Sequence, residues 1–538
     1  MEHLTDKRKG MIMIAILVAL FFSAINQTII GVAMPRIISK LGGMDYYTWA
    51  ISIYMLTSTV ATVLVGKLSD IYGRKPFILF GIGFFMIGAV LSGFSTNIFE
   101  LIAYRGISGM GAGIIMSTAF MAVGDLYAPR ERARWTGILS GVFGLSSVFG
   151  PALGGYVVDH FDWHWVFWVF LPLGVVAFIM ILKMFPRVDR KPGESIDYFG
   201  SIFLTLTIVS LLLAFSLAGN GPGKFAWISW QILGLFGSAA VTLVIFLVIE
   251  TKVKSPVLPL SLFKNSIVTV SNMAGFLLGA GMMGAMIYVP FFVQGVKGVS
   301  PTYSGYIMMP MSIMMAVVTG IAGQVISKRG KYKMMAIAGL TIMTIAMSLL
   351  HFINLDTPIY FIIIYMCIFG IGLGVSMPVI SLTVQNAAHP KELGVVTASS
   401  QLFRSLGSTI GIAVFGTVMS SRMAGKMQEM LASGNQINQA QIDPTYAEQF
   451  KKLMNPETLL DQPKLAEIQS QLPLEYQEIA TKMVDMVRET FSYGLTSTFL
   501  AGAIVMAVAV IFTLFLKEIP LRSASDYKQV EGSDERKN

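Results

Sequence analysis

The chain has little charge and almost no cysteine. Asp, Glu, Lys and Arg make up 13% of its 538 residues and apolar residues 54%, a balance that excludes an ordinary soluble globular protein. The single cysteine, Cys367, excludes an intramolecular disulfide and argues against a cysteine metal site. The net charge of +9 comes from short basic clusters beside apolar runs, which is typical of a membrane topology signal. We therefore expect an integral membrane protein without a nucleic-acid partner.

Signatures of nucleotide and metal chemistry are also missing. The chain has no P-loop pattern G-x-x-x-x-G-K-[ST], which argues against an ATP-driven pump. The stretch GAGMMG at 279–284 matches a dinucleotide fingerprint only formally, because it lies inside an apolar run and follows no strand. Aromatic residues crowd the stretch 159–168, so its Asp and His residues fit a membrane-interface belt better than a metal site. We expect no enzymatic activity, no cofactor and no metal.

Long apolar runs dominate what is present. Lipid offers no hydrogen-bond partners to a backbone, so continuous runs of about 20 apolar residues indicate membrane-spanning helices. The sequence therefore predicts an all-α integral membrane protein with fourteen spans. They are placed near 11–33, 47–66, 77–96, 100–124, 135–158, 164–185, 199–218, 229–249, 267–293, 303–327, 333–353, 358–384, 397–420 and 491–517.

Basic residues alternate between the two sides of these spans. With the N-terminus in the cytoplasm, the inner loops carry clusters of Lys and Arg, whereas the outer loops before the last carry at most two basic residues each. This distribution predicts that both termini are cytoplasmic. The inner clusters are Lys67/Arg74/Lys75, Arg130/Arg132/Arg134, Lys183/Arg187/Arg190/Lys191, Lys252/Lys254/Lys264 and Lys328/Arg329/Lys331/Lys333.

The last outer loop, 421–490, is long and polar. Apolar residues in it recur at helical spacing, as at Ile479, Met483 and Val487, and prolines interrupt the pattern. We expect short amphipathic helices that form a surface cap, with a gate or a partner-docking hairpin as the alternative. The polar segment 521–538 is expected to be a disordered cytoplasmic tail.

Two inner loops resemble each other. GKLSDIYGRKP at 66–76 and GQVISKRGKYK at 323–333 each hold two glycines seven residues apart, followed by a basic residue. Transporters are often built from such repeats, with the substrate site between them. We therefore expect an N-terminal six-helix half (1–186), an inserted helix pair with flanking cytoplasmic loops (187–266), and a C-terminal six-helix half that includes the outer loop (267–520).

The loop at 66–76 resembles motif A of the major facilitator superfamily. RGISGMGAG at 105–113 resembles motif B of that superfamily, and GVFGLSSVFGPALGG at 141–155 resembles motif C, the antiporter signature. WHWVFWVFLPLG at 163–174 and FRSLGSTIGIAVFG at 403–416 are similar to segments of its fourteen-helix drug:proton antiporter branch, which includes multidrug and quaternary-ammonium exporters of Gram-positive bacteria. The resemblance implies the major facilitator fold, with two six-helix halves and an inserted pair, in a bacterial plasma membrane.

Physical chemistry explains part of what these motifs require. Gly66 and Gly73 permit a tight turn, and Asp70 and Arg74 can form charge-assisted bonds that latch the two halves in one state. By resemblance, Asp70 faces a helix end of the second half and Arg74 pairs with Asp125. In motif C, closely spaced glycines allow close helix packing, and the resemblance adds export as the direction of transport. A positive-inside loop and plain helix packing are the simpler alternatives. The motif C candidates are Gly141, Gly150, Pro151, Gly154 and Gly155.

Proton coupling usually needs a titratable group inside the membrane, and this chain offers few. INQTIIGVAMP at 25–35 resembles a family pattern whose aspartate is the expected protonation site, but Asn26 stands there and an amide cannot release a proton. Either coupling has moved to Glu100, Asp125 or a group near Arg105, or the chain is an engineered neutral mimic of the protonated state. A hydrogen bond from Asn26 across helices is an equal alternative.

Methionine is abundant, with 35 residues, and supplies the adaptable surface that promiscuous binding sites use. A cavity poor in carboxylates favours neutral or monocationic amphipathic compounds over dications. We expect a monomeric multidrug efflux antiporter that exports lipophilic small molecules by alternating access and is driven by the proton gradient. An exporter or flippase of a lipid or endogenous metabolite, and a sensor that has lost transport, are the alternatives. The candidate cavity residues are Asn26, Met286, Gln294, Gln385, Gln401 and Arg404.

Overall fold

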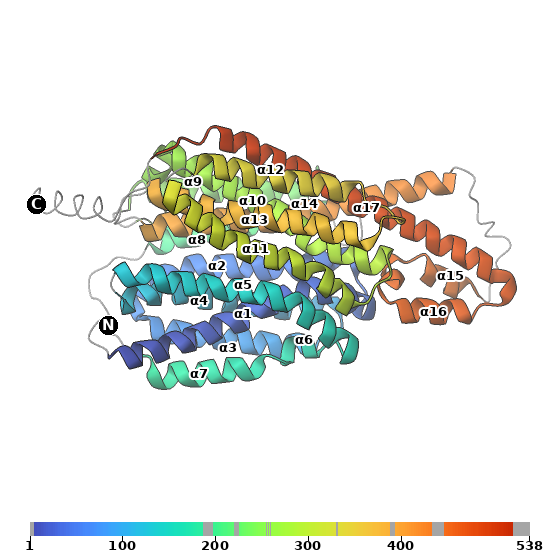
Figure 1. The fold of residues 1–538 in the computed structure, drawn as a ribbon, viewed down its shortest axis with the longest axis horizontal. Coiled ribbons are helices and arrows are strands. Elements are labelled where there is room, and N and C mark those ends of the chain that lie inside the picture. The colour runs from blue at the N-terminus through green and yellow to red at the C-terminus, as the bar shows by residue number, and fades with distance from the viewer. Residues whose placement is uncertain are drawn as a thin grey trace, which may run out of the picture.

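Long helices run side by side in one bundle, and a smaller group of short helices projects from one end of it (Figure 1). We call residues 446–473 the cap, the bundle end that carries them the cap end, and the opposite end, where α1 begins and α17 stops, the terminal end. This structure is a computed structural model. It describes residues 5–127, 129–186, 197–219, 225–253, 256, 258, 260–329, 332–387, 393–432 and 446–519.

The first half of the bundle is built by the helices from α1 to α7. α1 packs on α4, α5 and α7, and both α2 and α3 pack on α4. Only Gly73 separates α2 from α3, and its φ of 87° lies in a region that favours glycine. The bounds are α1 Asp6–Leu41, η1 Met44–Tyr46, α2 Tyr47–Tyr72, α3 Arg74–Gly93, α4 Ile98–Leu126, α5 Pro129–His160, α6 Trp165–Trp168 and α7 Leu171–Met184.

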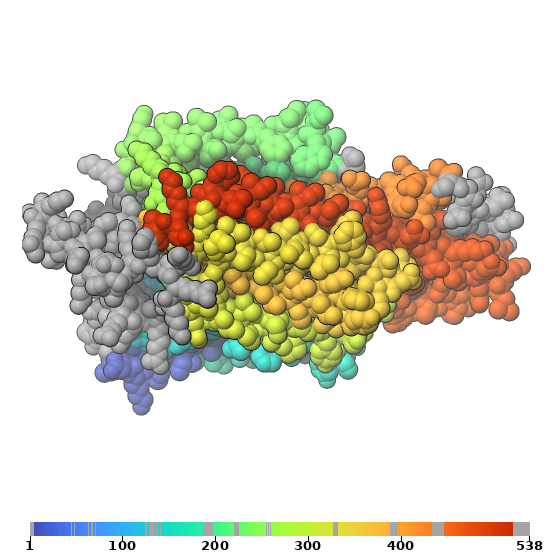
Figure 2. Space-filling view, turned by 45° about the horizontal axis from the view of Figure 1, so that its top comes forward, coloured from blue at the N-terminus to red at the C-terminus, as the bar shows by residue number. Residues whose placement is uncertain are grey.

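Two helices, α8 (Tyr198–Leu217) and α9 (Trp230–Glu250), form the inserted pair. They pack on each other, and α8 also contacts α2 of the first half and α14 of the second. Figure 2 shows the pair in green along the outside of the bundle. The expected inner loop 187–196 and the expected tail 521–538 lie outside the described residues, so the four-part division stays a prediction.

The second half of the bundle consists of α10 to α14 together with α17. α10 packs on α14, α17 and α13, while α11 packs on α13 and, across to the first half, on α5. The bounds are η2 Leu260–Lys264, α10 Ser266–Phe291, η3 Phe292–Val296 (a π-helical turn), α11 Pro301–Arg329, α12 Lys333–His351, α13 Ile359–Ala387, α14 Leu393–Ala432 and α17 Leu474–Leu514.

The cap consists of α15 (Ala447–Leu453), η7 (Pro456–Leu460) and α16 (Gln462–Ser470). Two of its prolines stand in the first turn of η7 and of α16, where a missing N–H costs no helical hydrogen bond, and the third, Pro473, directly precedes α17. The side chain of Asn455 caps η7, and that of Asp461 caps α16. The expected short helices are therefore present.

The number of spans agrees with the sequence. Within the described residues, thirteen helical segments are long and apolar enough to cross a membrane, with α6 and α7 counted as one segment. The helix α2 has 26 residues and lies in the same bundle, so it makes the fourteenth. The predicted all-α membrane architecture is confirmed.

The two spans that flank the cap are longer than the sequence predicts. We place their apolar cores at 397–420 and 491–517, but α14 continues to Ala432 and α17 begins at Leu474. The loop 421–490 is therefore not a separate string of short helices throughout. Its two ends continue the bundle helices beyond the apolar region, because the chain there keeps helical apolar spacing after the hydropathy has fallen.

Candidate functional site

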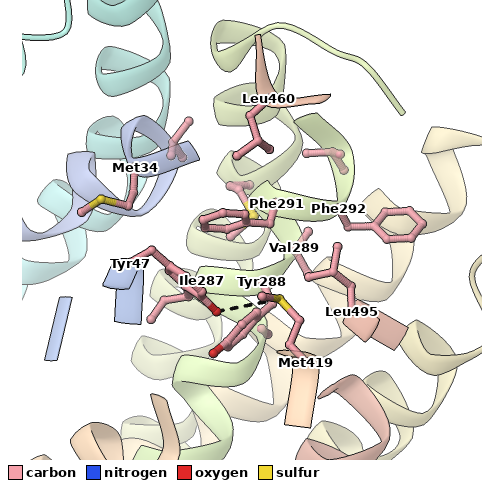
Figure 3. Close-up of a cluster of buried hydrophobic side chains, with 14 of the residues drawn as sticks. Met34, Tyr47, Ile287, Tyr288, Val289, Phe291, Phe292, Met419, Leu460 and Leu495 are labelled. Carbon is pink, nitrogen blue, oxygen red and sulfur yellow. Dashed lines mark hydrogen bonds between the residues drawn. The ribbon is translucent and has the colours of Figure 1, made fainter. Parts of the chain in front are cut away.

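A hydrophobic cluster closes the cap end of the space between the two halves (Figure 3). The ring centres of Tyr47 in the first half and Phe291 in the second are 4.8 Å apart, and the Tyr47 hydroxyl lies 3.9 Å from the sulfur of Met419. Met34 from α1 and Leu460 from the cap belong to the same buried cluster. The cluster therefore joins both halves and the cap.

Backbone contacts between α5 and α11 close the same end. A Cβ atom built on Gly155 would lie 2.2 Å from the Pro301 carbonyl oxygen, and one on Gly305 would lie 2.2 Å from that of Pro151. Such distances leave no room for any side chain. In addition, the Thr302 N–H donates to the Asp159 carboxylate at 2.8 Å. Two halves that approach this closely leave no passage beside these helices.

Gln294, an expected cavity residue, belongs to this closure. Its Nε2 donates to the Val32 carbonyl of the first half at 3.0 Å and to Ser304 at 3.2 Å. Met286, on the preceding turns of α10, packs against the same buried cluster. In this state both side chains line the closed end rather than an open cavity.

The cap is fastened to α1 by a buried ion pair. The Asp461 side chain is only 1% exposed and contacts the guanidinium of Arg36, while Lys40 lies 3.3 Å away. Burial opposes its ionisation, but the bond from Arg36 and the charges of Arg36 and Lys40 outweigh burial and hold the pKa of Asp461 below its usual range. Beside this pair, the Met44 N–H donates to the carboxylate of Glu457.

Arg105 occupies the interior of the first half. It is 2% exposed, its Nε donates to the Ala50 carbonyl on α2, and its guanidinium lies 5.1 Å from the ring centre of Tyr54. Among the described residues, no carboxylate forms an ion pair with it. Asn26 is also buried, at 2% exposure, and its Nδ2 has no partner among those residues.

The other two proton-coupling candidates lie at opposite ends of α4. Glu100 accepts from the N–H and hydroxyl of Thr96, in the first turn of α4, as part of a helix cap at the cap end. Asp125 lies in the last turn of α4, at the terminal end, and its side chain is outside the described part of the structure. The structure therefore does not gather these candidates into one site.

Motif A is described only in part. Arg74 is buried and donates to the Ser69 hydroxyl at 2.6 Å and to the Met121 sulfur at 3.2 Å. The surroundings of Gly66 and the side chain of Asp70 lie outside the described residues, as does that of Asp125. The expected latch stays a prediction.

The motif C glycines divide into two groups. A Cβ atom on Gly150 or Gly154 would clash with α1, at 2.0 Å from Thr28 Oγ1 and 2.9 Å from the Ile29 carbonyl oxygen, while Gly155 faces α11. Gly141, by contrast, has no neighbouring atom within 4 Å of such a Cβ. Close packing accounts for the cap-side glycines of this motif and leaves Gly141 without a packing role.

A small cavity opens in the second half, between α10, α13 and α14. It has a volume of about 40 Å³, and both Gln401 and Arg404 line it. Arg404 donates to the side-chain oxygen of Gln401. Gln385 donates at 3.3 Å to the hydroxyl of Thr397, which lines the cavity. The structure thus brings two of the expected cavity residues into this cavity and places a third one hydrogen bond from its lining.

Comparison with known proteins identifies the family. Residues 16–412 match the model of the Major Facilitator Superfamily. The chain belongs to this superfamily. Multidrug transporter protein MdtP of Bacillus subtilis (strain 168) is 38% identical over 530 residues, which cover 98% of this chain and 96% of that relative. Multidrug resistance protein 3 of the same organism is 32% identical over 418 residues, covering 78% of this chain and 81% of the relative.

Solved structures share the fold at low identity. A bacterial homolog of the human lysosomal transporter Spinster, in an inward-facing and unoccupied conformation, superimposes with a TM-score of 0.64 at 15% identity, covering 97% of this chain and 100% of the other. A D-xylose–proton symporter gives a TM-score of 0.54 at 12% identity, covering 76% and 90%. The superfamily and fold expected from the motifs are confirmed, and members of this superfamily are transporters, not enzymes.

Sequence reasoning singled out Gln294 and Gly155 but missed the ion pair and the aromatic residue that also close the cap end. Arg36 and Lys40 are four residues apart, so they share one face of α1 just beyond its apolar run, and this spacing is a readable signal. The partner, Asp461, gives no such signal, because it lies more than 400 residues away in a polar loop. Tyr47 likewise reads as one more apolar residue of its span.

Proposed function

We propose that this chain is a proton-coupled exporter of amphipathic, lipophilic compounds. Cargo binds between the two halves, which rock to expose it on the opposite side of the membrane. The observation that carries this proposal is the likeness over nearly the full length of both chains to a relative named a multidrug transporter. The closed cap end supports it, because a transporter that alternates access must seal one side at a time.

The orientation belongs to the same proposal. Basic residues cluster at the terminal end of the bundle, so we place that end in the cytoplasm and the cap outside a bacterial plasma membrane. The state described here is then closed to the outside. The protein works as a monomer, needs no cofactor, and takes its energy from the proton gradient.

Position 26 is the centre of the coupling question. Asn26 is buried with an unpartnered Nδ2, and burial would favour the protonated form of a carboxyl group placed there. An aspartate at this position could therefore bind a proton in one state and release it in another. In this chain, either a carboxylate at another position carries the proton, or Asn26 keeps position 26 permanently neutral, as a protonated aspartate would be.

Dye transport in proteoliposomes under an imposed pH gradient tests the proposal. The chain as given and its Asn26→Asp variant are measured in parallel, with liposomes lacking protein as the blank. Gradient-driven ethidium movement in either chain supports proton-coupled export, and movement in the aspartate variant alone assigns the proton to position 26. Absence of gradient-driven transport in both chains, for ethidium and for a neutral lipophilic dye, would refute the proposal.

A further inference from the structure

We propose that the cavity around Arg404 is a subsite for the oxyanion of the cargo, a carboxylate or phosphate group carried on an apolar body. The inference rests on the proposed function, since it names the chemical class of the compound that one side of the transport path receives. It also changes the expected charge of the cargo to negative, because the sequence alone favours neutral or monocationic compounds.

The lining of this cavity is polar on one helix and mainly apolar on the other two. α14 contributes only hydrogen-bonding side chains, those of Thr397, Ser400, Gln401 and Arg404. α10 and α13 contribute the apolar residues Leu278, Met377 and Ile380, together with Gly275 and Ser381. Donors on one helix and apolar side chains on its neighbours match a negatively charged head attached to an apolar body.

Within the described part of the chain, the charge of Arg404 has no counterion. Its hydrogen bond to Gln401 uses one of five N–H donors, and among the described residues no carboxylate forms an ion pair with it. A partly buried guanidinium without a counterion is costly, and an oxyanion that accepts two parallel N–H bonds offsets that cost. The described residues that line the cavity include no carboxylate to compete for the same donors.

Arg105, in the interior of the first half, does not offer the same chemistry. It is already bonded to the Ala50 carbonyl and lies over the ring of Tyr54. Its contacts join α4 to α2, which is a packing role. Arg404 is partly exposed where it lines the cavity, whereas Arg105 is 2% exposed. The oxyanion site is therefore assigned to the second half.

The helices hold Arg404 in place before any ligand arrives. A Cβ atom on Gly279 would lie 2.2 Å from the Arg404 carbonyl oxygen, and one on Gly407 would lie 1.8 Å from that of Phe276. α10 and α14 thus touch through their backbones. Pro378 interrupts the hydrogen bonding of α13 beside the cavity. A fixed arginine next to a locally loosened helix gives a preorganised donor with room beside it.

The size of the cavity limits what it can hold. About 40 Å³ is space for a head group and not for a whole drug molecule. Arg404 lies eleven residues into α14, roughly 16 Å from its terminal end. The apolar body of the cargo must therefore extend out of the cavity, along apolar residues of α10 and α13.

The test compares two probes that share a chain and differ in head-group charge. Radiolabelled dodecanoate binding is measured by scintillation proximity at pH 7.5 on the full-length protein in phosphatidylcholine nanodiscs, with dodecyltrimethylammonium as the competitor. The variants are Arg404→Gln and Arg404→Lys. Arg422→Gln is the matched control, since it makes the same substitution in the same helix at an exposed position.

We expect Arg404→Gln to weaken dodecanoate binding roughly 10- to 100-fold, because it removes a charge-assisted bond pair. Arg404→Lys keeps the charge but not the bidentate geometry, so a smaller loss is expected. Displacement by dodecyltrimethylammonium should not weaken in either variant. Dodecanoate affinity in Arg404→Gln within twofold of that in Arg422→Gln would overturn the inference.

Thermal melting guards against a folding artefact. Removing a partly buried cation that has no counterion among the described residues should leave the melting temperature of the ligand-free protein unchanged or raised, while the rise caused by dodecanoate disappears. A ligand-induced rise that survives in Arg404→Gln would also overturn the inference. This readout does not depend on transport.

A second arm separates a lipid from a soluble amphiphile as the source of the oxyanion. Nanodiscs with added phosphatidylglycerol are compared with the phosphatidylcholine discs. If dodecanoate binding is lost in the discs that contain phosphatidylglycerol, and this loss requires Arg404, the subsite is assigned to a lipid phosphate. Unchanged binding assigns it to a soluble amphiphile. If phosphatidylglycerol reduces dodecanoate binding by the same factor in Arg404→Gln as in the parent protein, the lipid does not act at Arg404 and the inference is contradicted.

The proposed function can fail separately. If no dye moves under a pH gradient while dodecanoate binding still depends on Arg404, export is refuted and the oxyanion subsite stands. If dye moves and dodecanoate binding ignores Arg404, export stands and the subsite is refuted.

Discussion

The two ends of the bundle are packed differently. At the cap end one continuous hydrophobic cluster takes side chains from the first half, the second half and the cap, with Tyr47, Phe291 and Leu460 among its members. Towards the terminal end the core divides, into a cluster built only from the first half and another built around Tyr332 only from the second. A smaller cluster joins α2 to α14 beside the inserted pair.

This difference shows where closure is stabilised. The halves share apolar burial, backbone contact and an ion pair at the cap end, and each half keeps its own core near the terminal end. Rocking must therefore break the shared contacts at the cap end, and it leaves the separate cores intact. Substitutions at the cap end should act on the closed state rather than on folding of either half.

The largest effect is expected from a side chain placed between α5 and α11. Gly155→Leu cannot fit against the Pro301 carbonyl, so it should disfavour the closed state by more than about 3 kcal/mol. The measurement is alkylation of a Val32→Cys reporter, buried in the closed state, in a Cys367→Ser background. Labelling should rise by more than about 100-fold.

Gly141→Leu is the control for this substitution, because nothing lies within 4 Å of a Cβ at that position of the same helix. It should leave the reporter protected. Protection retained in Gly155→Leu would show that the α5–α11 contact does not close the cap end.

The ion pair at Asp461 should have the next largest effect. Asp461→Asn leaves Arg36 and Lys40 partly exposed and able to regain water, so we expect the docked cap to lose roughly 1–3 kcal/mol. Spin labels at Phe99 and Glu467, both exposed in the closed state, report the separation of cap and first half.

The distance distribution in Asp461→Asn should broaden towards longer values. Glu475→Gln, an exposed carboxylate at the start of α17, should not change it. A distribution identical to that of the parent would mean that apolar contacts alone hold the cap.

The pH dependence of this ion pair has a defined sign. The pKa of Asp461 is lower in the docked cap than its undocked value of about 3.9. Ionised Asp461 therefore stabilises docking at any pH above the undocked value. This stabilisation is lost as the pH falls from that value through the lowered pKa. The same label pair should therefore give one distance between about pH 8 and 5.5. Loosening should begin below about pH 4. A transition between pH 5 and 7 would assign control of the cap to another group.

The smallest effect is expected at the hydroxyl of Tyr47. Tyr47→Phe keeps the ring against Phe291 and removes the hydroxyl, whose contacts with the Met419 sulfur and the Tyr288 side chain are together worth less than about 1 kcal/mol. Labelling of the Val32→Cys reporter should stay within about fivefold of the parent. A tenfold rise would show that this hydroxyl, and not the ring, seals the cap end.

Much of the fold can be predicted from the sequence, because lipid permits only helices and the motifs are specific. The boundaries of α14 and α17 could not be predicted in the same way. Hydropathy locates the lipid-embedded part of a helix, whereas α14 continues to Ala432 and α17 starts at Leu474 on polar sequence with helical spacing.

The candidate site could be predicted less well. Gln401 and Arg404 are three residues apart on one helix, so their meeting at one cavity follows from helical geometry. Gln294 shows the opposite case, since a polar residue in a span suggests a cavity, yet its amide bonds the backbone of the other half. How one half aligns with the other depends on tertiary packing, which residue type does not reveal.

The length of α14 has a mechanical consequence. It is one uninterrupted rod of 40 residues, about 60 Å long, that carries Arg404 in its first third and extends past the apolar region at the cap end of the bundle. From Arg404 to Ala432 the lever arm is roughly 42 Å, so a tilt of about 5° at the arginine would swing the far tip by about 4 Å. Binding of a ligand at Arg404, inside the membrane, would then displace the end of α14 near Ala432, outside the membrane.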